Sequence, residues 1–140
     1  MSKVAIVYWS GTGNTAAMAA AVEEGAKGRG ADVCVFGPSS FTADMVADFD
    51  AIAFGCPAMG AEVLEETEFD PMFTSIEGSL SGKRIALFGS YGWGDGQWMR
   101  DWEDRCISAG ARFTHDFVMG NNAPTPDVLD ECTSLGSSLA

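Results

Sequence analysis

Three short segments of the chain combine glycines with polar, aromatic or thioether side chains, and the first of them is suited to binding an anion. Residues 10–15 read Ser-Gly-Thr-Gly-Asn-Thr, with three hydroxyls, one amide and no Lys or Arg. A loop of this kind before a helix presents unpaired backbone N–H groups, and the helix dipole favours negative charge there. A nucleoside triphosphatase loop would need Gly-Lys-Ser/Thr. We therefore expect neutral donors to hold a terminal phosphate, with an ordinary strand-to-helix turn as the alternative.

The other two segments suit a flat aromatic ligand. Residues 56–62 read Cys-Pro-Ala-Met-Gly-Ala-Glu, and residues 89–95 read Gly-Ser-Tyr-Gly-Trp-Gly-Asp. Trp93 offers a stacking surface and Met59 offers a polarizable sulfur. Gly60 has no Cβ and can adopt the positive φ that a flipped peptide requires. Core packing for Met59 and Trp93, and a plain turn for Gly60, are the structural alternatives.

Hydrophobic runs and turn residues predict the elements that position these segments. Nearly continuous apolar runs predict strands buried on both faces, and four-residue apolar spacing predicts helices. Asp70-Pro71 and Thr125-Pro126 each place a capping residue before a proline, and Asp95 is a third candidate cap. We expect strands at residues 3–9, 31–36, 50–56, 84–90 and 112–119, and helices at residues 15–26, 42–47, 71–76, 96–109 and 126–139.

Strands and helices therefore alternate five times, which is typical of a doubly wound α/β fold with a parallel sheet and helices on both faces. Such sheets bind ligands beyond the carboxyl ends of their strands, where the strand order reverses. The three segments follow the first, third and fourth expected strands, so we expect them to meet at this edge. Trp98, Trp102 and Cys106 form a stripe that we expect to face the core.

Composition limits the class of protein. The 140 residues suit one domain, residues 1–140, and the net charge of −12 argues against binding to nucleic acid or to an anionic membrane. No run of about 18 apolar residues and no signal peptide is evident, so we expect a cytoplasmic protein. The four cysteines have no metal-site spacing, and we expect buried free thiols.

The three segments, with Tyr8 and Trp9 preceding the first, closely resemble the FMN loops of short-chain flavodoxins from anaerobic bacteria. The resemblance extends over the whole chain in order and length. It implies a five-stranded sheet of order 2-1-3-4-5 and one FMN held without a covalent bond. It also implies a monomeric, low-potential carrier of single electrons between redox enzymes, cycling mainly between the semiquinone and the hydroquinone.

The resemblance also assigns roles. The loop from Ser10 to Thr15 would hold the phosphate, and Met59 and Trp93 would cover the two faces of the flavin. Gly60 would turn its carbonyl toward flavin N5, and Glu62 would accept a hydrogen bond from N3. The expected FMN-binding residues, none of them catalytic, are Trp9, Ser10, Gly11, Thr12, Gly13, Asn14, Thr15, Pro57, Ala58, Met59, Gly60, Glu62, Ser90, Tyr91, Gly92, Trp93 and Gly94. The roles of Ala61 and Asp95 are left open.

Other functions have weaker support. A flavin-dependent quinone reductase is the serious alternative, but it would need a substrate pocket that Trp93 would cover. The sequence Gly11-x-Gly13-x-x-Ala16 weakly fits a dinucleotide site, yet no acidic residue ends the second expected strand. Receiver-domain and phosphatase chemistry lack their acidic and arginine residues. His115 is expected to be an exposed strand residue.

An acidic run follows the second segment. Its members are Glu62, Glu65, Glu66, Glu68 and Asp70, with no Lys or Arg among them. A negative field around the flavin edge would steer a partner with a basic docking surface and disfavour the second electron. The alternative is a solvated acidic face without function.

Overall fold

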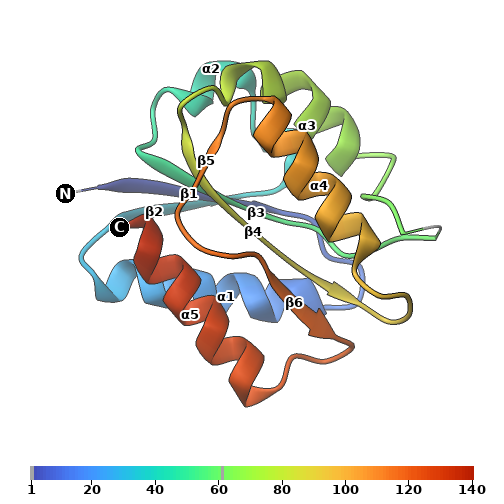
Figure 1. Cartoon of the computed structure of the whole chain (residues 1–140). Helices are drawn as coiled ribbons and strands as arrows, with labels where there is room; N and C mark the ends of the chain where they lie inside the picture. The colour runs from blue at the N-terminus through green and yellow to red at the C-terminus, as the bar shows by residue number, and fades with distance from the viewer. Residues whose placement is uncertain (1, 61) are drawn as a thin grey trace.

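The computed structural model describes residues 2–60 and 62–140, and it shows a parallel sheet between two layers of helices (Figure 1). Its strands are β1 (Lys3–Tyr8), β2 (Asp32–Phe36), β3 (Ala51–Gly55), β4 (Arg84–Tyr91), β5 (Arg112–Phe113) and β6 (Val118–Asn121). Its α-helices are α1 (Asn14–Gly28), α2 (Ala43–Val46), α3 (Phe69–Ile76), α4 (Gln97–Ser108) and α5 (Pro126–Leu139), with 3₁₀ turns at Pro38–Ser40 and Glu77–Ser79.

The sheet has the expected strand order. Neighbouring strands pair in parallel in the order β2-β1-β3-β4-β5, and β6 pairs with β4. The order reverses at β1 and β3, so their carboxyl ends form the crevice where such sheets bind ligands. This edge therefore brings the segments after β1, β3 and β4 together, as the sequence predicted.

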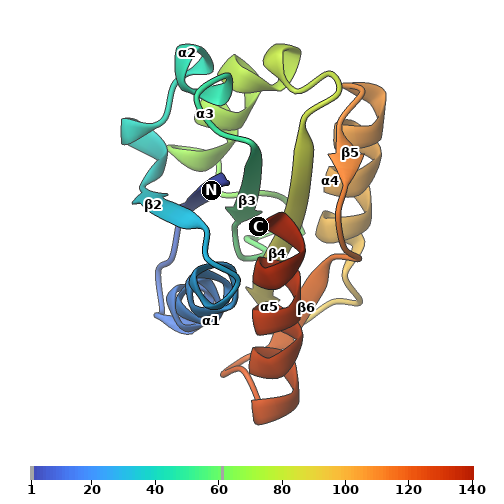
Figure 2. The same ribbon diagram turned by 90° about the vertical axis from the view of Figure 1, so that its left-hand side faces the viewer.

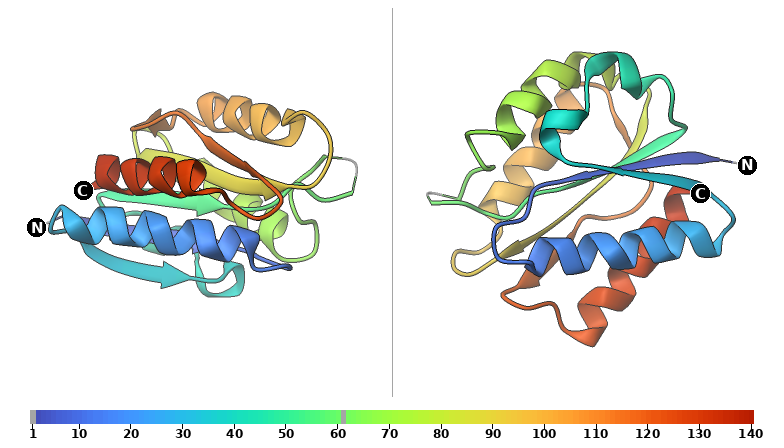
Figure 3. Two further views of the ribbon diagram at one scale, coloured as in Figure 1. Left: turned by 90° about the horizontal axis from the view of Figure 1, so that it is seen from below. Right: turned by 180° about the vertical axis from the view of Figure 1, so that it is seen from behind.

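Alternate strand residues pack against opposite helical layers. Val4 and Ile6 of β1 face α1 and α5, whereas Ala5 and Val7 face the layer of α2, α3 and α4. Turning the molecule shows α1 and α5 side by side on one face of the sheet (Figures 2 and 3). Both faces of the central strands are thereby buried, which explains their nearly continuous apolar sequence.

The two helices on that face pack unusually closely. A Cβ at Gly25 of α1 would lie 2.0 Å from the backbone oxygen of Thr133. A Cβ at Gly136 of α5 would lie 2.0 Å from the backbone oxygen of Val22. Only glycine fits these two positions, because any other side chain would force the helices apart.

The last expected strand is wrong in one respect. Residues 112–119 do not form one strand, because β5 ends at Phe113 and β6 begins at Val118. The Thr114 N–H still donates to the Ile85 oxygen at 3.0 Å, after which the chain leaves the sheet. His115, whose Nδ1 lies 2.7 Å from the Asp116 oxygen, therefore lies in this connection rather than on a strand.

Two of the three predicted helix caps are also wrong, and the third is confirmed. The Thr125 hydroxyl accepts from the Val128 N–H at 3.3 Å, as expected of a cap before Pro126. Asp70 instead lies inside α3, which begins at Phe69. Asp95 does not cap α4, because its carboxylate pairs with Arg100 at 3.0 Å. The carboxylates that do cap α3 and α4 are those of Glu65 and Glu62, two members of the acidic run.

The expected helical stripe is confirmed. Trp98 and Trp102 are each 1% exposed, and Cys106 is fully buried in the same cluster. Trp98 has a polar role as well, because its Nε1–H donates to the Cys56 oxygen at 3.2 Å. This bond ties α4 to the beginning of the second segment.

Candidate functional site

The first segment forms the entry to α1. Gly13 has a φ of +94° immediately before the helix, a conformation that favours glycine. The Ser10 hydroxyl accepts from the N–H groups of Gly13 and Ala16, each at 3.2 Å. Among the described residues, the N–H groups of Asn14 and Thr15 at the first two helical positions have no hydrogen-bond partner. The helix therefore points free donors at the sheet edge, as an anion site requires.

A buried hydroxyl pair connects the first segment with the third. Thr15 Oγ1 lies 2.8 Å from Ser90 Oγ, and these residues are only 1% and 4% exposed. The Ser90 backbone oxygen also accepts from the Ala58 N–H at 3.0 Å. Ser90 thus links all three segments, so the position of each depends on the others.

The second segment folds into a tight hairpin. Met59 and Val63 exchange backbone hydrogen bonds of 2.9 and 3.1 Å. Between them Gly60 has a φ of +46° and Glu62 a φ of +56°, while Ala61 lies outside the described residues. A left-handed φ is unusual for a glutamate. The backbone of this hairpin is therefore held by its surroundings rather than by local preference alone.

Glu62 supplies part of that support. Its Oε1 accepts from the N–H groups of Gly96 and Gln97, each at 3.2 Å, and so caps α4 in place of Asp95. A Cβ at Gly94 would lie 2.5 Å from its carboxyl carbon. The Glu62 carboxylate therefore joins the second segment to the third.

The three segments enclose one cavity of about 220 Å³. Most of its lining was predicted from the sequence: Trp9, Gly11, Thr12, Asn14, Pro57, Ala58, Met59, Ser90, Tyr91 and Gly92. The other predicted residues lie in the same segments but do not line it: Ser10, Gly13, Thr15, Gly60, Glu62, Trp93 and Gly94. Trp93 is 65% exposed, so its ring is free to pack on a ligand from outside.

Asn122 also lines the cavity and was missed by the sequence analysis. It follows β6, has a φ of +57° and donates its N–H to the Tyr91 oxygen at 2.7 Å. The available signal was an Asn-Asn pair just beyond a strand that ends at the same edge. Because the expected strand ended at residue 119, the sequence did not predict that these asparagines lie at the site.

The acidic run is not one solvated face. Glu65 is only 5% exposed, and its carboxylate accepts from the N–H groups of Thr67, Glu68 and Phe69 at 2.8–2.9 Å and from the Thr67 hydroxyl. Burial alone would raise the pKa of Glu65, but these hydrogen bonds outweigh it and lower the pKa to about 2. Glu65 therefore caps α3 as an anion.

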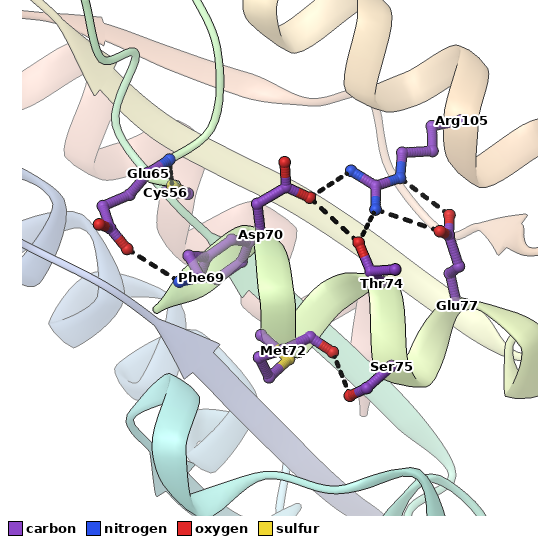
Figure 4. A network of polar contacts seen from close by, with 9 residues as sticks. All are labelled: Cys56, Glu65, Phe69, Asp70, Met72, Thr74, Ser75, Glu77 and Arg105. Carbon is purple, nitrogen blue, oxygen red and sulfur yellow. Dashed lines mark hydrogen bonds and ion pairs between the residues drawn. The ribbon is translucent and has the colours of Figure 1, made fainter. Parts of the chain in front are cut away.

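Arg105 of α4 neutralises the end of the run. It donates to Asp70 and Glu77, each at 2.8 Å, and also to Thr74 (Figure 4). Partial burial would lower the pKa of Arg105, but the hydrogen bonds to the two carboxylates outweigh it and raise the pKa. Glu66 remains an exposed acid of the run, without a hydrogen bond among the described residues.

Neither metal nor thiol chemistry is suggested by the described residues. No group of three or more His, Cys, Asp or Glu side chains in residues 2–60 and 62–140 is placed to hold a metal ion. All four cysteines are free: Cys56, Cys106 and Cys132 are buried and Cys34 partly so. Burial raises the pKa values of Cys106 and Cys132 to about 12, so these thiols stay protonated at neutral pH.

Among the helices of residues 2–60 and 62–140, none has the length and apolar character needed to cross a membrane.

Comparisons with known proteins agree with this geometry. The flavodoxin family model matches residues 6–136. The flavodoxins of Megasphaera elsdenii and Clostridium beijerinckii are 45% and 44% identical, over 98% and 96% of this chain and 98% and 97% of their own. The solution structure of two-electron reduced M. elsdenii flavodoxin has a TM-score of 0.89 at 46% identity and covers 97% of both chains. The chain therefore belongs to the flavodoxin family, as a short-chain member whose relatives are FMN-binding electron carriers rather than enzymes.

Proposed function

We propose that this protein holds one FMN without a covalent bond and carries single electrons at low potential, cycling mainly between the semiquinone and the hydroquinone. The observation that carries the proposal is the convergence of three segments on one cavity, whose lining includes Asn14, with its free N–H group, together with Met59 and Tyr91. This pairing of anion donors with apolar and aromatic groups suits a phosphorylated aromatic ligand.

Several residues of the three segments have the chemistry that FMN binding requires. The N–H groups of Asn14 and Thr15 are free to bind the phosphate, while Met59 and Trp93 are available to pack on the flavin. Glu62 uses Oε1 to cap α4, and its Oε2 has no hydrogen-bond partner among the described residues, so it is free to accept from flavin N3. FMN supplies the redox chemistry, and the protein binds, orients and shields it.

The visible absorption spectrum of the purified protein tests the proposal directly. We expect a flavin spectrum and one FMN per chain, released intact by acid precipitation because no covalent bond holds it. A covalently retained flavin, FAD in place of FMN, or apoprotein that fails to bind added FMN would contradict the proposal.

The conformation of Gly60 should control the semiquinone. Its φ of +46° lies in the left-handed region, a conformation that a carbonyl turning toward N5 would use and that a β-branched residue resists. We expect Gly60→Val to lower the semiquinone maximum in a redox titration, because the lost hydrogen bond is worth roughly 1 kcal/mol.

Gly60→Asn is the matched control, since asparagine tolerates a left-handed backbone better than other residues. Its semiquinone yield should lie between those of the wild type and the valine variant. Equal yields in all three proteins would show that this peptide does not contact the flavin.

Trp93 should cover the outer face of the flavin. We expect Trp93→Ala to weaken FMN binding about ten-fold and to restore fluorescence that stacking quenches, because the variant loses an aromatic contact of roughly 1–3 kcal/mol. Ile107→Ala is a suitable control: Ile107 is also a large exposed apolar residue, 57% exposed, but lies on α4 away from the segments. If FMN bound to Trp93→Ala remained non-fluorescent and its affinity were unchanged, another residue would stack on the flavin.

Charge should steer a partner with a basic docking surface. Lys3, Arg84 and Arg112 begin β1, β4 and β5, at the sheet edge opposite the site, while Glu66 is exposed near it. We expect the rate of electron transfer to cytochrome c, a basic protein, to fall about ten-fold as salt rises from 10 to 200 mM. The rate to ferricyanide, an anion, should rise instead. If the electron-transfer rates to cytochrome c and to ferricyanide changed in the same direction with salt, the charge asymmetry would have no steering effect.

A further inference from the structure

Trp9 separates the cavity from a neighbouring groove. Its backbone N–H donates to the Gly55 oxygen at 3.0 Å, and its half-buried indole lies over the first segment, where a Cβ at Gly11 would come within 3.0 Å of the ring. The indole lines both the cavity and an adjoining groove that includes Phe36, Pro38 and Glu68. Its orientation therefore determines the shape of one cavity wall.

A side-chain hydrogen bond to a distant residue orients this ring. The Trp9 Nε1–H donates to Glu68 Oε2 at 2.9 Å, although the two residues are 59 positions apart. The Glu68 backbone is itself held, because its N–H donates to the buried Glu65 carboxylate at 2.8 Å. The beginning of α3 thus fixes the carboxylate, and the carboxylate fixes the indole.

We propose that Glu68 is a positioning residue for the binding site: it holds the Trp9 indole as a wall beside the phosphate-binding segment, and so sets the affinity for FMN. This inference rests on the proposed function, that FMN occupies the cavity. It divides the acidic run by role, because Glu65 caps α3, Glu68 orients Trp9 and Glu66 contacts solvent. Glu68, which belongs to the acidic run in the sequence, therefore acts on the binding site through the Trp9 indole.

A double-mutant cycle tests the contact. Glu68→Ala removes the acceptor, Trp9→Phe removes the donor but keeps a ring, and the double variant removes both. We expect Glu68→Ala to weaken FMN binding about five-fold, the size of one net hydrogen bond. In Trp9→Phe protein the same Glu68→Ala change should have almost no further effect, since its partner is already gone.

Two matched variants separate position from charge. Glu68→Gln keeps an acceptor oxygen and should stay within about two-fold of the wild type, whereas a charge effect would make it resemble Glu68→Ala. Glu66→Ala removes the same charge two residues away and should leave FMN affinity unchanged. In the apoprotein, the Trp9 indole N–H resonance in a ¹H–¹⁵N spectrum should move in Glu68→Ala and remain in place in Glu66→Ala.

The outcomes distinguish this inference from the proposed function. Wild-type protein that does not bind FMN would overturn the proposed function. Wild-type protein that binds FMN, with equal affinity in Glu68→Ala and Glu66→Ala, would overturn only the role of Glu68. The role of Glu68 would also be overturned if the effects of the Trp9 and Glu68 substitutions on FMN affinity were additive. It would be overturned as well if the Trp9 indole resonance did not move in Glu68→Ala.

Discussion

FMN should bind the apoprotein at least a hundred-fold more tightly than riboflavin, which has the same ring system without the phosphate. The free N–H groups of Asn14 and Thr15, together with the helix dipole, face the position where the phosphate would lie. Hydrogen bonds to a charged group contribute roughly 1.5–3 kcal/mol each, so two such bonds give about 3–6 kcal/mol, or two to four powers of ten. Fluorescence-quenching titrations with the two flavins measure this ratio.

Thr12→Val makes the test specific to the first segment. The Thr12 side chain is exposed in the loop and lines the cavity, so its loss should weaken FMN binding but leave riboflavin binding unchanged. Thr42→Val is the control, because Thr42 is an exposed threonine before α2 whose side chain caps no helix. An FMN-over-riboflavin selectivity that is undiminished in Thr12→Val would exclude a phosphate contact from that hydroxyl. Equal affinities of the wild type for both flavins would remove the phosphate assignment altogether.

Glu65→Gln should destabilise the protein by about 2 kcal/mol at pH 7. The hydrogen bonds to the Glu65 carboxylate lower its pKa from 4.5 to about 2, and a shift of that size corresponds to roughly 3 kcal/mol of stability. Glutamine retains one acceptor oxygen, so part of the cap survives in the variant. Urea unfolding of both proteins at pH 7 measures the difference.

The same carboxylate predicts a pH dependence with a definite sign. Because the folded-state pKa is lower than the ordinary value, the stabilisation is fully present above pH 4.5 and is lost as pH falls from 4.5 towards 2. The stability difference between wild type and Glu65→Gln should therefore shrink across this window. Glu66→Gln, which removes an exposed carboxylate beside it, should track the wild type at every pH. A difference that stays constant between pH 7 and pH 3 would show that Glu65 does not act as an anionic cap.

A cap at Glu65 also affects the site. The Glu65 N–H donates to Cys56 Sγ at 3.4 Å, and its carboxylate accepts from the N–H of Phe69, so Glu65 ties the first residue of the second segment to the beginning of α3 (Figure 4). Destabilising this residue should therefore loosen the hairpin that carries Met59 and Gly60.

Local sequence signals were sufficient to predict the fold class and the sheet edge at which the three segments meet. Apolar runs and turn residues depend on neighbours along the chain, so they predicted the alternation of strands and helices and the three segments at the carboxyl edge. The cap at Thr125 was predictable for the same reason, since donor and acceptor are three residues apart. The resemblance of the three segments to flavodoxin loops then supplied the strand order, which the comparisons and the sheet confirm.

The roles of several of the acidic residues could not be predicted from the sequence, because each of these depends on a partner from a distant part of the chain. Asp95 is the nearest acid before α4, but Glu62, more than thirty residues earlier, caps that helix because the hairpin brings it to the helix end. Arg105 neutralises Asp70 although no basic residue interrupts the acidic run in the sequence. A side-chain hydrogen bond requires two atoms about 3 Å apart, and that distance is set by how α3, α4 and the hairpin pack rather than by spacing along the chain. The three segments that line the cavity were thus predictable from local sequence, whereas the packing of distant elements determined the partner of each charged side chain around it.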